Sequence, residues 1–257
     1  MAKKKEVAKV DNGGLPAELA DEIEQDAGDG LQNYTTDDLM MPFMRIIQKM
    51  SPQLDHQEPQ YIEEAEYGEI INTVTNERWP ADEGILVIPC SFNFKHIEWR
   101  PRKEGGGIAN VFPRGDVLPH TTPDDRGRDI TDEGNTLTPT QEHFVLIVGE
   151  GGTCERACIP MSSTQLKYGR KWGSLINQQI IQTAEGNKPA PTYSRMYRLK
   201  TMFESNEDGS WGSWNISLEG VIDNIELYRT AKDFAKAIEA GKVKVKHVQE
   251  GEEPESM

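Results

Sequence analysis

Residues 84–100 read GILVIPCSFNFKHIEWR, and this stretch decides the fold class that the sequence predicts. Its first half is an apolar run rich in β-branched residues. In its second half Phe92, Phe94 and His96 alternate with Asn93, Lys95 and Ile97. Alternation with a period of two residues is typical of a half-buried strand. We therefore expect one long strand here.

Further elements are expected on both sides of this strand, from apolar periodicity, turn residues and helix caps. Before it, residues 43–50 have the spacing of a short amphipathic helix or a buried extended segment, and residues 68–75 predict a strand. After it we expect a hairpin over 143–161, a helix from Ser162 or Ser163 to about Ala184, strands over 192–205 and 210–222, and a helix over 224–240.

From residue 84 onward this order is strand, hairpin, helix and two strands, which is the order of the OB-fold. The predicted fold class is α+β and β-rich: an OB-fold-like five-stranded barrel with an inserted helix and a C-terminal helix. A single domain is expected over 39–248, with a long mobile loop at 103–140 because that stretch is rich in Gly, Pro, Asp and Thr without periodicity.

Charge is distributed unevenly around a net value of −15. Residues 10–44 contain nine acids and no Lys or Arg, whereas residues 91–200 contain 15 Lys and Arg against 12 Asp and Glu. We expect residues 1–38 to be an acidic disordered segment and residues 249–257 to be an acidic tail. A basic middle flanked by acidic ends leaves nucleic acid open as a partner.

The composition indicates a cytoplasmic protein. The three cysteines are an odd number, which disfavours a secreted disulfide framework. The first ten residues are basic and lack the apolar core of a signal peptide. No apolar run approaches the roughly 18 residues that a membrane span needs, so no membrane partner is expected.

No sequence motif for catalysis is present. The chain lacks a P-loop, a Rossmann fingerprint, a zinc-protease HExxH and a GxSxG nucleophile motif. Cys154 and Cys158 fall on one face of a predicted strand without two further ligands at metal-binding spacing. We therefore expect neither an enzyme nor a metal or other cofactor.

Three stretches combine basic and aromatic residues, a pairing that suits single-stranded nucleic acid because cations follow the phosphates and flat rings receive unpaired bases. The candidate DNA-binding residues are Lys95, Trp99, Arg100, Arg102 and Lys103 in the first stretch, Lys167, Tyr168, Arg170, Lys171 and Trp172 in the second, and Tyr193, Arg195, Tyr197, Arg198 and Lys200 in the third.

Each stretch also has a purely structural interpretation, and Trp99 in the first stretch, at a strand end beside a glycine triplet, fits either interpretation. Trp172 fits a helix position in the core, and Lys167 with its neighbours fits a solvated helix face. In the third stretch Tyr193, Arg195 and Tyr197 would share one strand face, which is either a stacking surface or the covered exterior of a barrel. The DNA-binding interpretation requires that the three stretches converge on one channel.

Several blocks resemble the single-stranded DNA-binding proteins of tailed bacteriophages: MPFMRIIQKMSPQLD, YGEIINTVTNERW, VIPCSFNFKHIEWRPRKEGGG and MSSTQLKYGRKW, all within residues 41–172. The resemblance implies an OB-fold core and sequence-independent binding and protection of single-stranded DNA in phage replication or recombination, in the cytoplasm of the infected host. The acidic tail would then recruit phage replication proteins, although it lacks the terminal aromatic residue of many such tails.

Other classes of function remain open on the sequence alone. A phage structural or assembly protein of the head or neck, without catalytic activity, explains the β content and acidity equally well. A nuclease with an unfamiliar site and an acidic DNA mimic are further alternatives.

Overall fold

The computed structural model describes residues 16–34, 39–207 and 209–243. The chain forms two compact units, Met1–Leu39 and Met40–Met257. The first contains the helix α1, Ala17–Gln25, within the segment for which disorder is predicted. Leu19 and Ile23 are one turn apart there, and Glu18 in the first turn is favourable to the helix dipole. The predicted tail at 249–257 lies outside the described residues.

An antiparallel eight-stranded sheet forms the body of the second unit. Its central order is β13-β12-β4-β8-β7-β6, and β5 pairs with β4 while β9 pairs with β8. The strands are β4 Ile85–Trp99, β5 Ile108–Pro113, β6 Thr121–Pro123, β7 Asp129–Thr131, β8 Thr136–Val148, β9 Cys154–Ser162, β12 Arg195–Asn206 and β13 Gly209–Val221.

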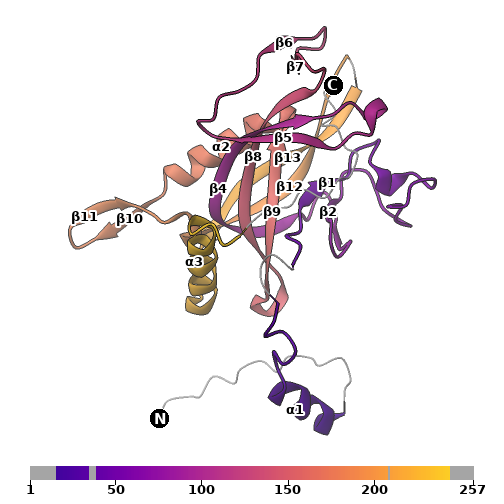
Figure 1. Ribbon diagram of the computed structural model, residues 1–257. Coiled ribbons are helices and arrows are strands. Elements are labelled where there is room, and N and C mark those ends of the chain that lie inside the picture. The colour runs from indigo at the N-terminus through magenta and orange to yellow at the C-terminus, as the bar shows by residue number, and fades with distance from the viewer. Residues whose placement is uncertain (1–15, 35–38, 208, 244–257) are drawn as a thin grey trace, which may run out of the picture. The chain divides into compact units, whose positions relative to one another are not determined.

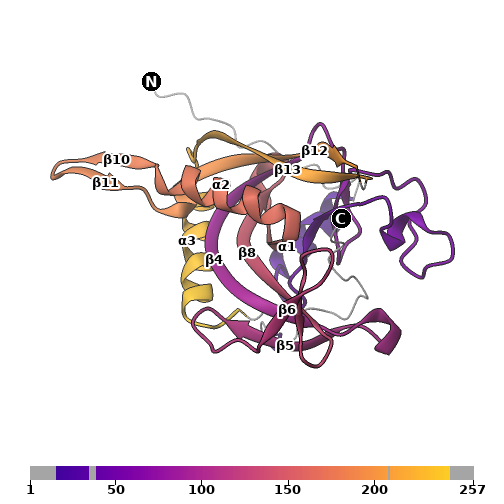
Figure 2. The ribbon, with the colours of Figure 1, turned by 90° about the horizontal axis from the view of Figure 1, so that it is seen from above.

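The sheet is strongly curled, as a half-barrel, and β4 is the strand that carries the bend (Figure 2). β4 pairs with β12 through its first residues and with β5 through its last ones, so it connects two parts of the curl. A register shift lies between Pro89 and Ser91 in its pairing with β8. A β-bulge of this kind bends a strand and increases its twist.

Two hydrophobic clusters cover the two faces of the curled sheet. On one face α2, Leu166–Asn177, and a small sheet pack on residues that include Val87, Val145 and Tyr197. On the other face α3, Ile225–Glu239, packs on residues that include Ile88 and Phe144. We call these the α2 face and the α3 face.

Two smaller sheets complete the unit. One contains β1 Met44–Ile46, β2 Ile70–Asn72 and β3 Arg78–Trp79. The other is a two-stranded hairpin of β10 Ile180–Thr183 and β11 Gly186–Pro189, which projects beside α3 as an arm (Figure 1). Within the described ranges no helix is both long and apolar enough to cross a membrane.

From β4 onward the predicted strand, hairpin, helix and two strands occur in the expected order, as β4, β8–β9, α2 and β12–β13, and the C-terminal helix is α3. The strands β5–β7 and β10–β11 lie between them, and the main sheet has eight strands, so the expected five-stranded barrel is wrong in its strand number. The β-rich α+β class is confirmed. Residues 43–50 take the extended alternative, as β1. The predicted helix end at Ala184 is wrong, because α2 ends at Asn177 and the β-branched Ile180 and Ile181 begin β10.

The prediction of a long mobile loop at 103–140 is also wrong. β5, β6, β7 and the first part of β8 lie within it. Its short strands are separated by tight turns at positive-φ glycines such as Gly115, Gly127 and Gly134. Strands of three to six residues between such turns are too short to give a visible period in the sequence.

Candidate nucleic-acid interface

A row of rings follows β4 on the α2 face, beyond the edge of the hydrophobic cluster, with Phe92 exposed and Phe94 and His96 half-buried. Phe92 pairs directly with His143, and Phe94 with Gln141, so these β4 rings share a face with His143. His143 in turn stacks on Trp172 of α2, with ring centroids 4.7 Å apart. Because the strand alternates, His96 continues the same row. Phe92 is 44% exposed.

Arg114, which follows β5, lies over this row. Its guanidinium carbon is 4.8 Å from the Phe94 ring centroid and 6.0 Å from that of Phe92. Phe94 and His96 meet edge to face, with centroids 5.2 Å apart. We call Phe92, Phe94, His96 and Arg114 the β4 strip. It offers flat rings at about 6.7 Å intervals along an extended strand, together with one exposed cation.

The β4 strip is held in place by α2. Gly169 of α2 lies so close to the sheet that an added Cβ would be 1.9 Å from Gln141 Oε1 and 3.1 Å from His143 Nε2. Phe92 contacts His143 with centroids 5.1 Å apart. A buried stack of His143 and Trp172 therefore supports the exposed end of the row, and fixes the orientation of Phe92.

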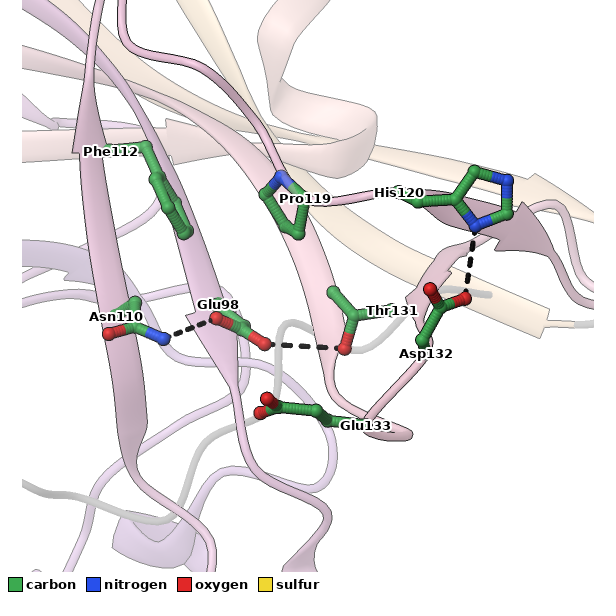
Figure 3. A pocket seen from close by; sticks show the side chains of 8 residues that line it. All are labelled: Glu98, Asn110, Phe112, Pro119, His120, Thr131, Asp132 and Glu133. Carbon is green, nitrogen blue, oxygen red and sulfur yellow. Dashed lines mark hydrogen bonds and ion pairs between the residues drawn. The ribbon is translucent and has the colours of Figure 1, made fainter.

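A pocket lies at the other end of the β4 strip (Figure 3). It has a volume of about 220 Å³ and is lined by Glu98, Asn110, Phe112, Pro119, His120, Thr131, Asp132 and Glu133. Phe112 pairs directly with His96, and Asn110 with Glu98, so both project from β5 on the face of the β4 strip. We call this the Glu98 pocket.

Glu98 is 3% exposed and is held by three donors. Asn110 Nδ2 donates to Oε2 at 2.7 Å, while Asn135 Nδ2 and Thr131 Oγ1 donate to Oε1 at 2.8 and 3.2 Å. Burial raises the pKa of Glu98, but these hydrogen bonds outweigh burial and hold it below its usual range. At neutral pH the pocket therefore contains a carboxylate.

The two histidines nearby differ in environment. Burial lowers the pKa of His96, and the Asp129 carboxylate opposes that shift. His96 is thus a neutral ring at neutral pH. His120 is largely exposed and its Nδ1 lies 3.0 Å from Asp132 Oδ1 at the rim of the Glu98 pocket.

The first basic stretch contributes no residue to the β4 strip, although the Arg100 charge acts on Glu98 in the adjoining pocket. Lys95 projects from the opposite face of β4 and forms an ion pair with Glu142, at 2.5 Å, in which both side chains are largely buried. Trp99 is half-buried at the end of β4, and Arg100 donates to the carbonyl of Ile108 at 2.8 Å. Lys103 is exposed in a short 3₁₀ turn that also contains Arg102.

The second stretch forms α2. Trp172 is fully buried against His143, so it supports the site and offers no face to a base. Lys167 pairs with Glu204 at 2.7 Å and lies over the half-buried Tyr168 ring. Arg170 and Lys171 are exposed on α2.

The third stretch does not form the predicted Tyr-Arg-Tyr surface. Tyr193 lies in a 3₁₀ turn before β12 and packs edge to face on Tyr228 of α3. Tyr197 is fully buried in the cluster on the α2 face. Arg195 donates to Gln179 Oε1 at 3.3 Å, across to the segment that leads into β10.

Arg198 and Lys200 alternate with the buried Tyr197 and Leu199, so they project from the α3 face. Arg198 lies 3.9 Å from Glu219. The expected convergence of the three stretches on one channel is therefore wrong, and the interpretation of these 15 residues as one DNA-binding site fails with it. Aromatic residues of a strand with one buried face are drawn into the core, and the cations between them then point to the other side.

Sequence reasoning missed Phe112 and Arg114 and did not single out Phe92 and Phe94 as site residues. The alternation in residues 92–97 was a signal, because it places two phenylalanines and a histidine on one strand face. Arg114 gave no signal, since it belongs to the stretch that was expected to be a loop. Within the described residues no group of three or more His, Cys, Asp or Glu side chains could hold a metal ion.

The chain matches the family described as Pam3 phage gp34-like protein over residues 9–244. The chain belongs to this family, whose description points to a bacteriophage origin. No curated protein and no solved structure matches the chain.

Proposed function

We propose that this member of the Pam3 phage gp34-like family binds single-stranded DNA without sequence specificity, in phage replication or recombination. The observation that carries the proposal is the β4 strip: two phenylalanine rings and a histidine on the open end of a curled sheet, with the Arg114 guanidinium over two of them. Rings of this kind stack on unpaired bases, and the guanidinium can contact a phosphate or a base face.

Magnitudes favour a nucleic-acid ligand for these groups. Each cation–π contact of Arg114, with Phe92 and with Phe94, contributes about 0.5 to 1 kcal/mol to the stability of this arrangement in the free protein. Stacking of a base on an aromatic side chain contributes about 1 to 3 kcal/mol. A single strand would therefore compete well with Arg114 for the ring faces, while leaving that cation beside the phosphates.

The arrangement of the sheet agrees with an OB-fold-like body. β4, the β8–β9 hairpin, α2 and the β12–β13 pair have the order of that fold, and the sheet curls as a half-barrel. In OB-folds oligonucleotides bind across an open strand face. The β4 strip lies on such a face, beyond the part that α2 covers.

The test is the affinity for fluorescent oligo-dT of the double variant Phe92→Leu with Phe94→Leu. Leucine keeps most of the apolar contact but removes the flat ring, so the fold is retained while stacking is lost. We expect affinity to fall by about 10- to 100-fold, as two lost stacks imply.

The matched control is Phe203→Leu, which replaces a ring that is 54% exposed on β12 and packs on Tyr67 instead. This control should bind as the unchanged protein does. Equal affinity of the double variant and the control would remove the β4 strip from the binding surface.

A further inference from the structure

The Glu98 pocket has the size and the lining of a site for one small planar group. Its volume of about 220 Å³ is below the range of about 300 to 1,000 Å³ that is typical of drug-sized ligands. Figure 3 shows the Glu98 carboxylate between Asn110 and Thr131, with Phe112 and Pro119 nearby. The pocket thus combines one aromatic side chain with polar groups that would orient a ligand.

Hydrogen-bond acceptors are in excess in this pocket. A carboxylate has about four acceptor positions. Among the residues that the structure describes, three donors reach Glu98, two at Oε1 and Asn110 at Oε2. One position at Oε2 is therefore left. Asp132 and Glu133 add carboxylates to the lining. A ligand that matches these groups must bring N–H donors.

The pocket is also continuous with the β4 strip. Phe112 pairs directly with His96, which meets Phe94 edge to face. A strand of DNA whose bases stack on Phe92 and Phe94 would therefore bring its next bases to the pocket.

We propose that the Glu98 pocket binds one nucleobase that carries an exocyclic amino group, with cytosine as the pyrimidine case. Its amino group would donate to Glu98 Oε2 while its ring lies against Phe112. Uracil and thymine have a carbonyl oxygen in place of the cytosine amino group, and this oxygen would face the carboxylate. The proposal rests on the proposed single-strand binding and gives it a base preference.

The test compares oligo-dC with oligo-dU of equal length in one buffer near neutral pH. The two pyrimidines have the same ring size and backbone, so stacking and phosphate contacts are closely matched. They differ in the amino or carbonyl group at ring position 4 and in N3, which is an acceptor in cytosine and carries a hydrogen in uracil. We expect oligo-dC to bind about three- to tenfold more tightly, the size of one net hydrogen bond.

Two variants locate the preference. Glu98→Gln removes the carboxylate, and Phe112→Leu removes the ring without disturbing the three donors around Glu98, so it serves even if the first variant does not fold. In each of these two variants the affinity for oligo-dC should equal the affinity of the same variant for oligo-dU. Val111→Leu, on the opposite face of β5, is the control and should keep the preference.

Equal affinity of the unchanged protein for the two oligonucleotides would overturn the base preference and leave single-strand binding standing. A preference that persists in Phe112→Leu would also overturn it. If neither oligonucleotide binds, the proposed function itself fails.

Discussion

His143 connects the exposed β4 strip to the core, between Phe92 and Trp172. Its Nε2 has no hydrogen-bond partner among the described residues, and burial lowers the pKa of His143 to about 3. The ring is thus neutral in the folded protein at any physiological pH. A charged imidazole here would be both desolvated and unpaired.

This burial predicts a loss of stability in mild acid. An unfolded histidine has a pKa of about 6.5, so between pH 6.5 and pH 3 the unfolded chain binds a proton that the folded protein does not. The free energy of unfolding is therefore undiminished by His143 above pH 6.5, and it decreases as the pH falls toward 3. At about pH 5 His143 should lower the free energy of unfolding by about 2 kcal/mol.

Urea unfolding of the unchanged protein and of His143→Leu at about pH 7.5 and pH 5 measures this effect. The difference between the two pH values should be smaller in the variant by about 2 kcal/mol. His96, whose pKa is also lowered, stays in both proteins and cancels in the comparison. An undiminished pH dependence in the variant would show that His143 is not buried as described.

At the scale of elements, the packing of α2 on the sheet determines whether the β4 strip is supported. α2 contains two glycines, Gly169 and Gly173, one turn apart. A Cβ on Gly169 would meet Gln141 Oε1 at 1.9 Å, whereas nothing lies within 4 Å of a Cβ on Gly173. One glycine therefore permits close packing, and the other is a weak point of the helix.

Opposite results are expected for alanine at the two positions. Gly173→Ala should raise the free energy of unfolding by about 0.5 to 1 kcal/mol, because alanine is the better helix former. Gly169→Ala should lower it by about 1 to 3 kcal/mol, because α2 must move away from the sheet. Urea unfolding measures both, and stabilisation by Gly169→Ala would contradict the close contact.

The elements differ in how far the sequence predicts them. The long strand at 85–99, the hairpin over 143–161 and α3 follow from apolar runs and turn residues, because each has enough buried side chains to show a period in the sequence. α3 also has a clear start, where Asn224 Oδ1 accepts from the backbone of Glu226 and Leu227. The strands β5, β6 and β7 do not follow, because they are short and are held by pairing with distant residues.

The site was less predictable than the fold, for a reason that belongs to the whole molecule. Which side of a strand is buried depends on what packs against it, and sequence alternation does not say which side that is. Tyr197 and Trp172 occupy the core, while Phe92 is exposed because it lies beyond the reach of α2. Arg114 joins the rings only through the pairing of β5 with β4.

Charge is also a property of the whole chain. The net charge of −15 includes four acids between residue 250 and the end. These acids lie outside the described residues. The sequence predicts that they form a negative segment that competes with DNA for the cations. Recruitment of replication proteins by this segment stays a prediction. Deleting residues 250–257 should therefore tighten oligo-dT binding several-fold at low salt, with little effect at high salt. Unaltered low-salt affinity in this deletion would exclude autoinhibition by the tail.

The most direct measurement of the central claim is the affinity for oligo-dT as a function of NaCl concentration, for the unchanged protein, Arg114→Ala and Arg198→Ala. Because counterions are released on binding, each phosphate contact contributes about 0.7 to the slope of log affinity against log salt. We expect steep weakening with salt, a slope smaller by about 0.7 in Arg114→Ala, and no change in Arg198→Ala, whose cation projects from the α3 face. No binding at low salt, or equal slopes in all three proteins, would contradict the proposed interface and leave a structural or assembly role.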